Sequence, residues 1–158
     1  EGALHIVSER ISENPEFRGQ LRERMLAEGV VRAKVAEGKE SEKTKYEMYY
    51  KFEEAVQRIP SHRMLAIRRG ARENILTFSV NLDSDKFIAD LISKVVRGQS
   101  QFSPLLERAV RDAYERLLQP SIQNEVRSIL RERAEFEAIK VFEENLRTFW
   151  YLLSGVMT

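Results

Sequence analysis

The sequence predicts a mainly α fold, a multi-helix module with one or two short β-strands that ends in a long amphipathic helix. Apolar residues recur at spacings of three and four along most of the 158 residues, as one face of a helix requires. Residues 75–80 show instead the alternation of a half-buried strand. Prolines mark the starts of helices in three places: Asn14-Pro15, Ser103-Pro104 and Pro120-Ser121.

The N-terminal part of the chain predicts two helices. The first carries Leu4, Val7 and Ile11 on one face, at i, i+3 and i+7. In the second, Asn14 is the expected N-cap, Pro15 takes the first helical position, and a glycine ends the helix at position 29. The apolar side of this second helix consists of Phe17, Leu21, Met25 and Leu26.

The middle of the chain is expected to combine a loop, helices and a strand. Residues 30–35 are β-branched enough for an extended segment, and a charged loop follows. Residues 45–56 predict a helix rich in aromatic side chains, and Ser61 predicts the N-cap of another helix that runs to about Gly70. The strand at 75–80 must pair with residues 30–35, with another chain, or with a sheet of a missing domain, because one strand cannot stand alone.

From Asp83 onward the sequence is typical of helices. Asp83 or Ser84 caps the first, Ser103-Pro104 opens the second, and the third and longest begins at Pro120. The apolar residues of this last helix step by three and four: Ile122, Val126, Ile129, Phe136, Ile139, Phe142, Leu146, Phe149 and Leu153.

Residues 1–158 are therefore expected to form a single helical module. Its parts are a helical pair (1–29), a segment with a loop, helices and a short strand (30–82), and the C-terminal helices (83–158). Because the chain opens with Glu1 rather than Met and runs almost at once into a helical pattern, we expect a fragment of a larger multi-domain protein.

The composition narrows the function mainly by exclusion. The 26 basic and 25 acidic residues nearly cancel, so net charge argues neither for nor against a nucleic-acid partner. Without cysteine there is no disulfide, thiolate zinc site or cysteine nucleophile. His5 and His62 stand in no metal-ligand spacing, and no phosphate-binding glycine motif occurs. We therefore expect no enzyme activity, no metal and no cofactor. No apolar run reaches the ~18 residues that cross a bilayer, and no signal peptide is visible, so we expect a cytoplasmic protein without a membrane partner.

A basic cluster is the first candidate site. Four arginines lie within ten residues and are opposed only by Glu73, and the helix start at Ser61 could present free backbone N–H groups to a phosphate. The alternative is that the arginines pair with glutamates of a neighbouring helix. The predicted nucleic-acid surface consists of His62, Arg63, Arg68, Arg69, Arg72 and Lys39.

Three tyrosines precede this cluster. Tyr46, Tyr49 and Tyr50 could stack on bases. Their spacing of i, i+3 and i+4 is also that of a packed helix face, and we favour packing.

The second candidate site lies at the end of the last helix. Five successive apolar or aromatic residues, 149–153, cover every side of a helix, so one side faces this module and the rest needs a neighbouring domain or chain. The alternative is a core helix buried on all sides within the module. The predicted docking residues are Phe149, Trp150, Tyr151 and Leu153.

A set of short motifs spans most of the chain and resembles the central region of the Tex family, the RNA-binding transcriptional accessory proteins of bacteria. The motifs are Lys34-Val35, Gly38-Lys39-Glu40, Lys45-Tyr46, Tyr49-Tyr50, Ile59-Pro60-Ser61-His62-Arg63, Leu65-Ala66, Arg69-Gly70, Glu73, Leu118, Pro120-Ser121, Glu125, Ala134-Glu135, Ala138-Ile139, Val141-Phe142 and Asn145-Leu146. The part from Pro60 to Gly70 is the most specific. The chain departs from the family at Lys43 and Asn74, where glycine is common, and at Met48, where aspartate is common.

The resemblance implies a function that composition alone does not. Proteins of this family carry an RNase H-like domain, helix-hairpin-helix motifs and a C-terminal S1 domain, and this chain contains none of those signatures. The implied role is a central helical scaffold that positions the RNase H-like and RNA-binding domains. The implied partners are other domains of the same protein, RNA or DNA mainly through domains absent here, and the transcription machinery. Two alternatives stay open: a direct nucleic-acid-binding module that uses the arginines, and a protein-interaction adaptor that docks through the C-terminal helix.

Overall fold

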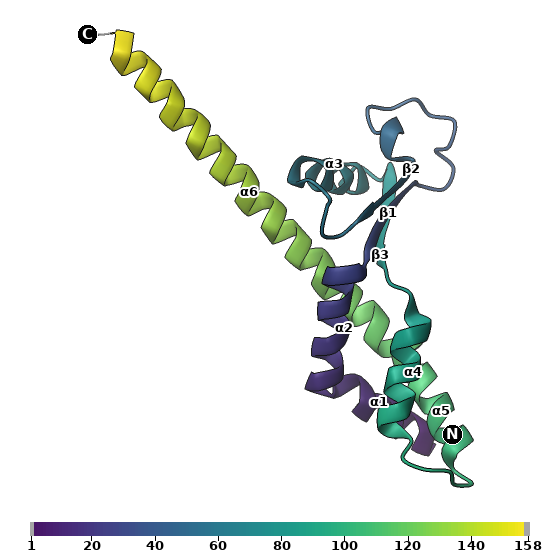
Figure 1. Cartoon of the computed structure of the whole chain (residues 1–158). Coiled ribbons are helices and arrows are strands. Elements are labelled where there is room, and N and C mark those ends of the chain that lie inside the picture. Colours follow the sequence, from purple (N-terminus) through teal and green to yellow (C-terminus); the bar gives the residue numbers. More distant parts are fainter. Residues whose placement is uncertain (1, 157–158) are drawn as a thin grey trace. The chain divides into compact units, whose positions relative to one another are not determined.

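The computed structural model describes residues 2–156 and is mainly α-helical, as the sequence predicts. A small three-stranded sheet interrupts the helices (Figure 1). In chain order the elements are α1 (Gly2–Glu13), α2 (Pro15–Glu28), β1 (Val30–Val35), the 3-10 turn η1 (Glu47–Tyr49), β2 (Lys51–Ala55), α3 (Ser61–Arg72), β3 (Leu76–Asn81), α4 (Ser84–Val95), α5 (Ser103–Asp112), the π-helical segment η2 (Ala113–Leu118) and α6 (Gln119–Val156).

The described chain divides into two compact units. The first comprises the residues up to Arg32, Glu53–Arg58 and Ser79–Arg127. The second comprises Ala33–Phe52, Ile59–Phe78 and the residues from Ser128 onward. The strands and α6 each contribute residues to both units.

The first unit is a helical bundle. Helix α5 contacts both α1 and α4. The buried Ser8 hydroxyl of α1 donates to the carbonyl of Ala109 at 3.2 Å. The rings of Phe87 and Tyr114 lie 5.8 Å apart, and the guanidinium of Arg24 sits 5.6 Å from the centre of the Phe87 ring. Aromatic packing therefore joins α4 to the π-helical segment in this core.

Local chemistry sets the ends of the helices in this unit. The Asn14 side chain accepts hydrogen bonds from the backbone N–H groups of Glu16 and Phe17, at 2.9 and 3.3 Å. The N–H of Gly29 closes α2 by donating to the carbonyl of Met25 at 3.0 Å. Both ends of α2 are as predicted. Asp83 caps α4, also as predicted, by accepting from the N–H of Asp85 at 3.3 Å.

The sheet has the strand order β2-β1-β3, so β1 is the central strand. The strand predicted at 75–80 therefore pairs with residues 30–35, which confirms one of the three pairings considered. Along β1 the side chains alternate: Val31 and Ala33 are buried and Arg32 and Lys34 are exposed, as expected for a strand with one covered face.

The predicted helix at 45–56 is wrong. This segment forms the 3-10 turn η1 and then strand β2. Aromatic residues suit a strand as well as a helix. Here the pairing with β1 decides in favour of the strand. The N–H of Val35 donates to the carbonyl of Tyr50 at 3.3 Å, and the N–H of Val56 donates to the carbonyl of Gly29 at 2.9 Å.

Three predicted helix starts need correction. Pro60 rather than Ser61 is the N-cap of α3. The Ser61 hydroxyl donates to the carboxylate of Glu137 and accepts no capping hydrogen bond from a backbone N–H. Helix α5 begins at Ser103, with Phe102 as its N-cap. No break occurs before Pro120, because the chain stays helical from α5 through η2 into α6.

The π-helical segment explains how the chain passes Pro120. A proline inside an α-helix lacks an N–H and crowds the carbonyl four residues earlier. Here the N–H of Gln119 donates to the carbonyl of Tyr114, five residues back, so this turn is wider. The wider turn accommodates the proline and joins two predicted helices into one.

Candidate nucleic-acid interface

Helix α3 has two faces with different roles. Met64, Ile67 and Gly70 are buried. The close approach at Gly70 is specific, because a Cβ atom there would stand 2.6 Å from Cδ1 of Leu76 and 3.3 Å from Cδ1 of Tyr46. This packing fixes which face of α3 points outward.

The outward face of α3 carries three arginines around a hollow of about 160 Å³. We call it the arginine hollow, and its lining residues are Leu65, Arg68, Arg69 and Arg72 of α3 and Glu135 of α6. The α3 residues follow one another at i, i+3, i+4 and i+7, which is the spacing of a single helix face. Three guanidinium groups therefore share one concave surface with one carboxylate.

Glu135 engages one of these arginines. Nη1 of Arg68 donates to Oε1 of Glu135 at 3.2 Å, and the two side chains are 23% and 53% exposed. Arg69 and Arg72 are exposed. The Arg72 side chain makes no hydrogen bond or ion pair with any residue that the structure describes. The hollow thus keeps an excess of positive charge after Glu135 is paired.

The other acidic neighbour, Glu73, is occupied elsewhere. It accepts a hydrogen bond from the Tyr46 hydroxyl at 2.8 Å and an ion pair from Nζ of Lys45 at 3.4 Å. The Tyr46 hydrogen bond, followed by Lys45, holds the pKa of Glu73 below its usual value, and Arg69 adds a weaker attraction. The hydrogen bonds with Tyr46 and Glu73 raise the pKa of Lys45. Glu73 therefore stays ionised but is tied to the chain before α3.

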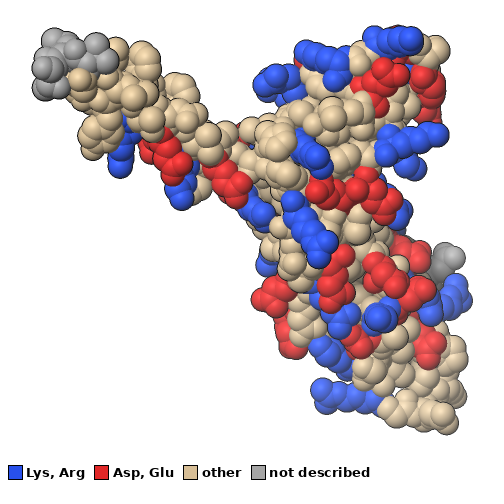
Figure 2. Space-filling model, turned by 45° about the horizontal axis from the view of Figure 1, so that its top comes forward, with Lys and Arg blue, Asp and Glu red and all other residues tan. Residues whose placement is uncertain are grey.

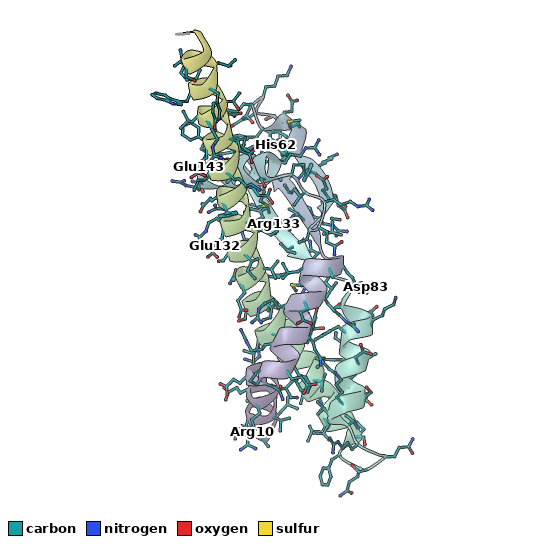
Figure 3. All side chains as sticks on the ribbon, turned by 60° about the vertical axis from the view of Figure 1, so that its left-hand side comes forward. Arg10, His62, Asp83, Glu132, Arg133 and Glu143 are labelled. Carbon is teal, nitrogen blue, oxygen red and sulfur yellow. The ribbon has the colours of Figure 1, made fainter. Side chains whose placement is uncertain are left out.

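The start of α3 differs from the phosphate site that we considered from the sequence. The Ser61 hydroxyl binds the Glu137 carboxylate and lowers its pKa, and Arg133 lies 3.5 Å from the same carboxylate. A negative charge already stands at this helix start, so it is poorly suited to a second anion. Figure 3 shows His62 at this end of α3 and Arg133 on α6.

The structure separates the six predicted nucleic-acid residues into two groups. Arg68, Arg69 and Arg72 line the arginine hollow. The remaining three do not line it: His62 is exposed, Arg63 is half-buried and engaged in contacts of its own, and Lys39 lies in the loop after β1.

Sequence reasoning missed two residues of the hollow. Leu65 could have been found, because it stands three, four and seven residues before the arginines on the same face. Glu135 lies 67 residues from Arg68. The sequence indicates that a glutamate of a neighbouring helix could pair with the arginines, but it does not indicate which one.

The tyrosines pack, as predicted. Tyr46 and Tyr49 are buried, and the ring of Tyr49 meets that of Phe52 edge-on at 5.4 Å. The Tyr50 hydroxyl donates to the carbonyl of Glu42 at 2.7 Å. The burial of Tyr46 and Tyr49 leaves their rings little surface on which a base could stack.

The end of α6 presents a long apolar surface. Within the second unit, α6 continues past α3 with no other element of that unit beside it (Figure 1). Figure 2 shows that its last turns, next to the grey atoms at the upper left, are almost entirely uncharged. The large exposed side chains, which we call the apolar stretch, are Phe136, Ile139, Val141, Phe142, Leu146, Phe149, Trp150, Tyr151, Leu152 and Leu153, and they are 47% to 69% exposed apart from Trp150 at 71%. The alternative of a core helix buried within the module is therefore wrong for these residues.

Two other kinds of site do not occur among residues 2–156. No group of three His, Asp or Glu side chains there could hold a metal ion. No helix in the same range is long and apolar enough to cross a membrane.

Comparisons with known proteins agree with the resemblance seen in the motifs. Residues 1–142 match the family described as Tex central region-like. The chain is 37% identical over 149 residues to the uncharacterized protein YdcI of Bacillus subtilis, a match that covers 93% of this chain and 21% of the relative. It is 30% identical to Protein tex of Bordetella pertussis, over 93% of this chain and 20% of that protein. It is also 30% identical to the human S1 RNA-binding domain-containing protein 1, over 92% of this chain and 16% of that protein. The chain thus spans about a fifth or less of the length of these relatives. It belongs to the Tex central region-like family.

Proposed function

We propose that this chain is the central helical scaffold of a Tex-like transcription accessory protein that binds nucleic acid, and that it has no catalytic role of its own. In this proposal it positions the RNase H-like and RNA-binding domains of such a protein. The observation that carries the proposal is the apolar stretch of α6. A soluble monomer rarely leaves so large a contiguous apolar surface in water unless another surface covers it.

The spacing of the apolar stretch suits a helical or flat partner surface. Ile139, Phe142, Leu146, Phe149 and Leu153 stand at i, i+3, i+7, i+10 and i+14. Helices with this repeat present one continuous seam to a neighbour. Trp150 and Tyr151 extend the surface to a second side. Aromatic side chains of this kind supply much of the binding energy of interfaces.

The relatives indicate where that neighbour comes from. Each aligned relative is about five or more times longer than the matched region, so other parts of the same protein adjoin it. One relative is named for an S1 RNA-binding domain. We therefore propose other domains of the same protein as the occupants of the apolar stretch, and nucleic acid as a partner reached mainly through those domains.

Binding between this chain and the rest of a relative tests the scaffold. The chain is mixed with the Bacillus subtilis relative from which the matching region has been deleted, and the affinity is measured by calorimetry. We expect a complex that Leu153→Glu weakens at least tenfold, because a charge would be buried in an apolar interface. Met48→Glu is the matched control, since Met48 is 70% exposed but lies outside α6. A complex that tolerates Leu153→Glu, or no complex at all, would contradict the proposal.

Direct nucleic-acid binding is the second candidate function. The observation in its favour is that Arg68, Arg69 and Arg72 share one hollow instead of being dispersed. The test is binding of a labelled single-stranded RNA and a labelled DNA duplex across a salt series. We expect the variant Arg68→Ala with Arg69→Ala to bind more weakly, and its salt slope to fall by roughly 0.7 to 0.9 for each phosphate that the variant can no longer bind.

The control for this test removes the same charge elsewhere. Arg58 and Arg97 are exposed, and their side chains make no hydrogen bond or ion pair with a described residue. The variant Arg58→Ala with Arg97→Ala should change the affinity and the salt slope only by the general effect of removing two positive charges. Equal reductions of affinity in the two double variants would refute a role for the arginine hollow.

A further inference from the structure

We propose that the arginine hollow is a seat for a single phosphate group of a nucleic-acid backbone, and that Glu135 is a built-in competitor for that seat. This inference rests on the second candidate function and adds to it the ligand group and a residue that weakens binding. The seat is formed by Arg68, Arg69 and Arg72 of α3.

The composition of the arginine hollow favours a phosphate over a base. Its walls hold no aromatic ring on which a base could stack. Leu65 supplies an apolar edge, which fits the sugar on either side of a phosphate.

The chemistry of the walls favours the same group. Guanidinium groups bind phosphate oxygens in a bidentate manner and stay charged at any physiological pH. The Arg72 side chain has no ion pair or hydrogen bond among the described residues, and Glu73, the acid nearest to it in sequence, is held by Tyr46 and Lys45.

Glu135 carries the competitor role. Its carboxylate lines the hollow and accepts a hydrogen bond from Nη1 of Arg68. It therefore already uses a donor that a phosphate oxygen would bind. A phosphate that enters must displace this carboxylate or share Arg68 with it, against the repulsion between two anions. Because Glu135 is 53% exposed, it can leave into water at low cost.

Neutralising Glu135 tests the inference. The variant Glu135→Gln keeps the shape of the side chain and removes its charge. We expect this variant to bind single-stranded RNA or duplex DNA about two- to fivefold more tightly at low salt, which corresponds to ~0.4 to 1 kcal/mol and lies within the range of an exposed ion pair. The gain should shrink as salt is added. Both probes carry the same phosphodiester group, and the larger gain identifies the preferred source.

The matched control is Glu143→Gln. Glu143, labelled in Figure 3, lies on the same helix, eight residues or about 12 Å further along, and is not among the residues that line the hollow. The two substitutions change the net charge equally, so only Glu135→Gln should tighten binding beyond the general effect of charge.

The outcomes separate this inference from the function on which it rests. A gain confined to Glu135→Gln, and abolished when Arg68→Ala and Arg69→Ala are added, supports the competitor. Loss of binding in the arginine variant without a gain in Glu135→Gln keeps the nucleic-acid function and overturns the competitor. A weaker Glu135→Gln variant also overturns it, because Glu135 would then position Arg68. No effect of the arginines overturns both.

Discussion

Replacing Gly70 with alanine tests the packing that orients the arginine face of α3. The new Cβ would lie 2.6 Å from Cδ1 and 2.9 Å from Cγ of Leu76, which is itself buried. Overpacking of this kind costs about 1 to 3 kcal/mol. Alanine in a helix interior recovers about 1 kcal/mol relative to glycine. The free energy of unfolding should therefore fall by about 1 kcal/mol.

Gly19 provides the matched control for this substitution. It lies inside α2, and a Cβ there would meet no atom within 4 Å. Gly19→Ala should therefore raise the free energy of unfolding by about 0.5 to 1 kcal/mol through helix propensity alone. Urea denaturation followed by far-ultraviolet circular dichroism measures both changes. If Gly70→Ala stabilises the chain as much as Gly19→Ala does, α3 does not pack closely on Leu76 and the orientation of its arginines is not fixed in this way.

Three further predictions concern the first unit. The Tyr114 hydroxyl is buried without reaching hydrogen-bond geometry to any described residue, and burial raises its pKa to about 12. Tyr114→Phe removes this unpaired hydroxyl, so the free energy of unfolding should stay unchanged or rise by up to about 1 kcal/mol. Burial tends to raise the pKa of Glu125, but hydrogen bonds from Arg22 and Arg18 outweigh it and leave the pKa below 4.5. The stability that this carboxylate contributes is thus present above pH 4.5 and is lost as the pH falls through its folded-state pKa, and Glu125→Gln should flatten that part of a stability-pH profile. Arg116 holds the pKa of Asp112 at about 2. Asp112→Asn should therefore remove the part of the acid-induced loss of stability that occurs at the lowest pH values.

Features set by neighbouring residues could be predicted from the sequence. Asn14 and Pro15 start α2, and Gly29 ends it, because caps are satisfied within a few residues of themselves. The prediction failed where a distant partner decides. The segment that includes β2 becomes extended because it pairs with β1, which no local pattern in its own residues encodes.

The candidate site shows the same division. The arginines of α3 were visible as a cluster, and their spacing from Leu65 contains the information that they share a face. The position of Glu135 could not be deduced, because the contact depends on how α6 packs against α3. Ser61 is a further case of this kind. Its residue type favours a cap, in which the hydroxyl would accept from a backbone N–H, but the hydroxyl instead donates to the carboxylate of Glu137, 76 residues away.

The exposure of Trp150 tests the central claim most directly. It is the only tryptophan in the sequence and is 71% exposed, so a chain labelled with 5-fluorotryptophan gives a single fluorine resonance that reports on the apolar stretch. We predict a resonance typical of hydrated indole in the chain alone. When the remaining domains of the Bacillus subtilis relative are added, that resonance should shift and lose its sensitivity to a soluble paramagnetic quencher. A resonance that stays equally accessible while those domains are present in excess would contradict the scaffold function.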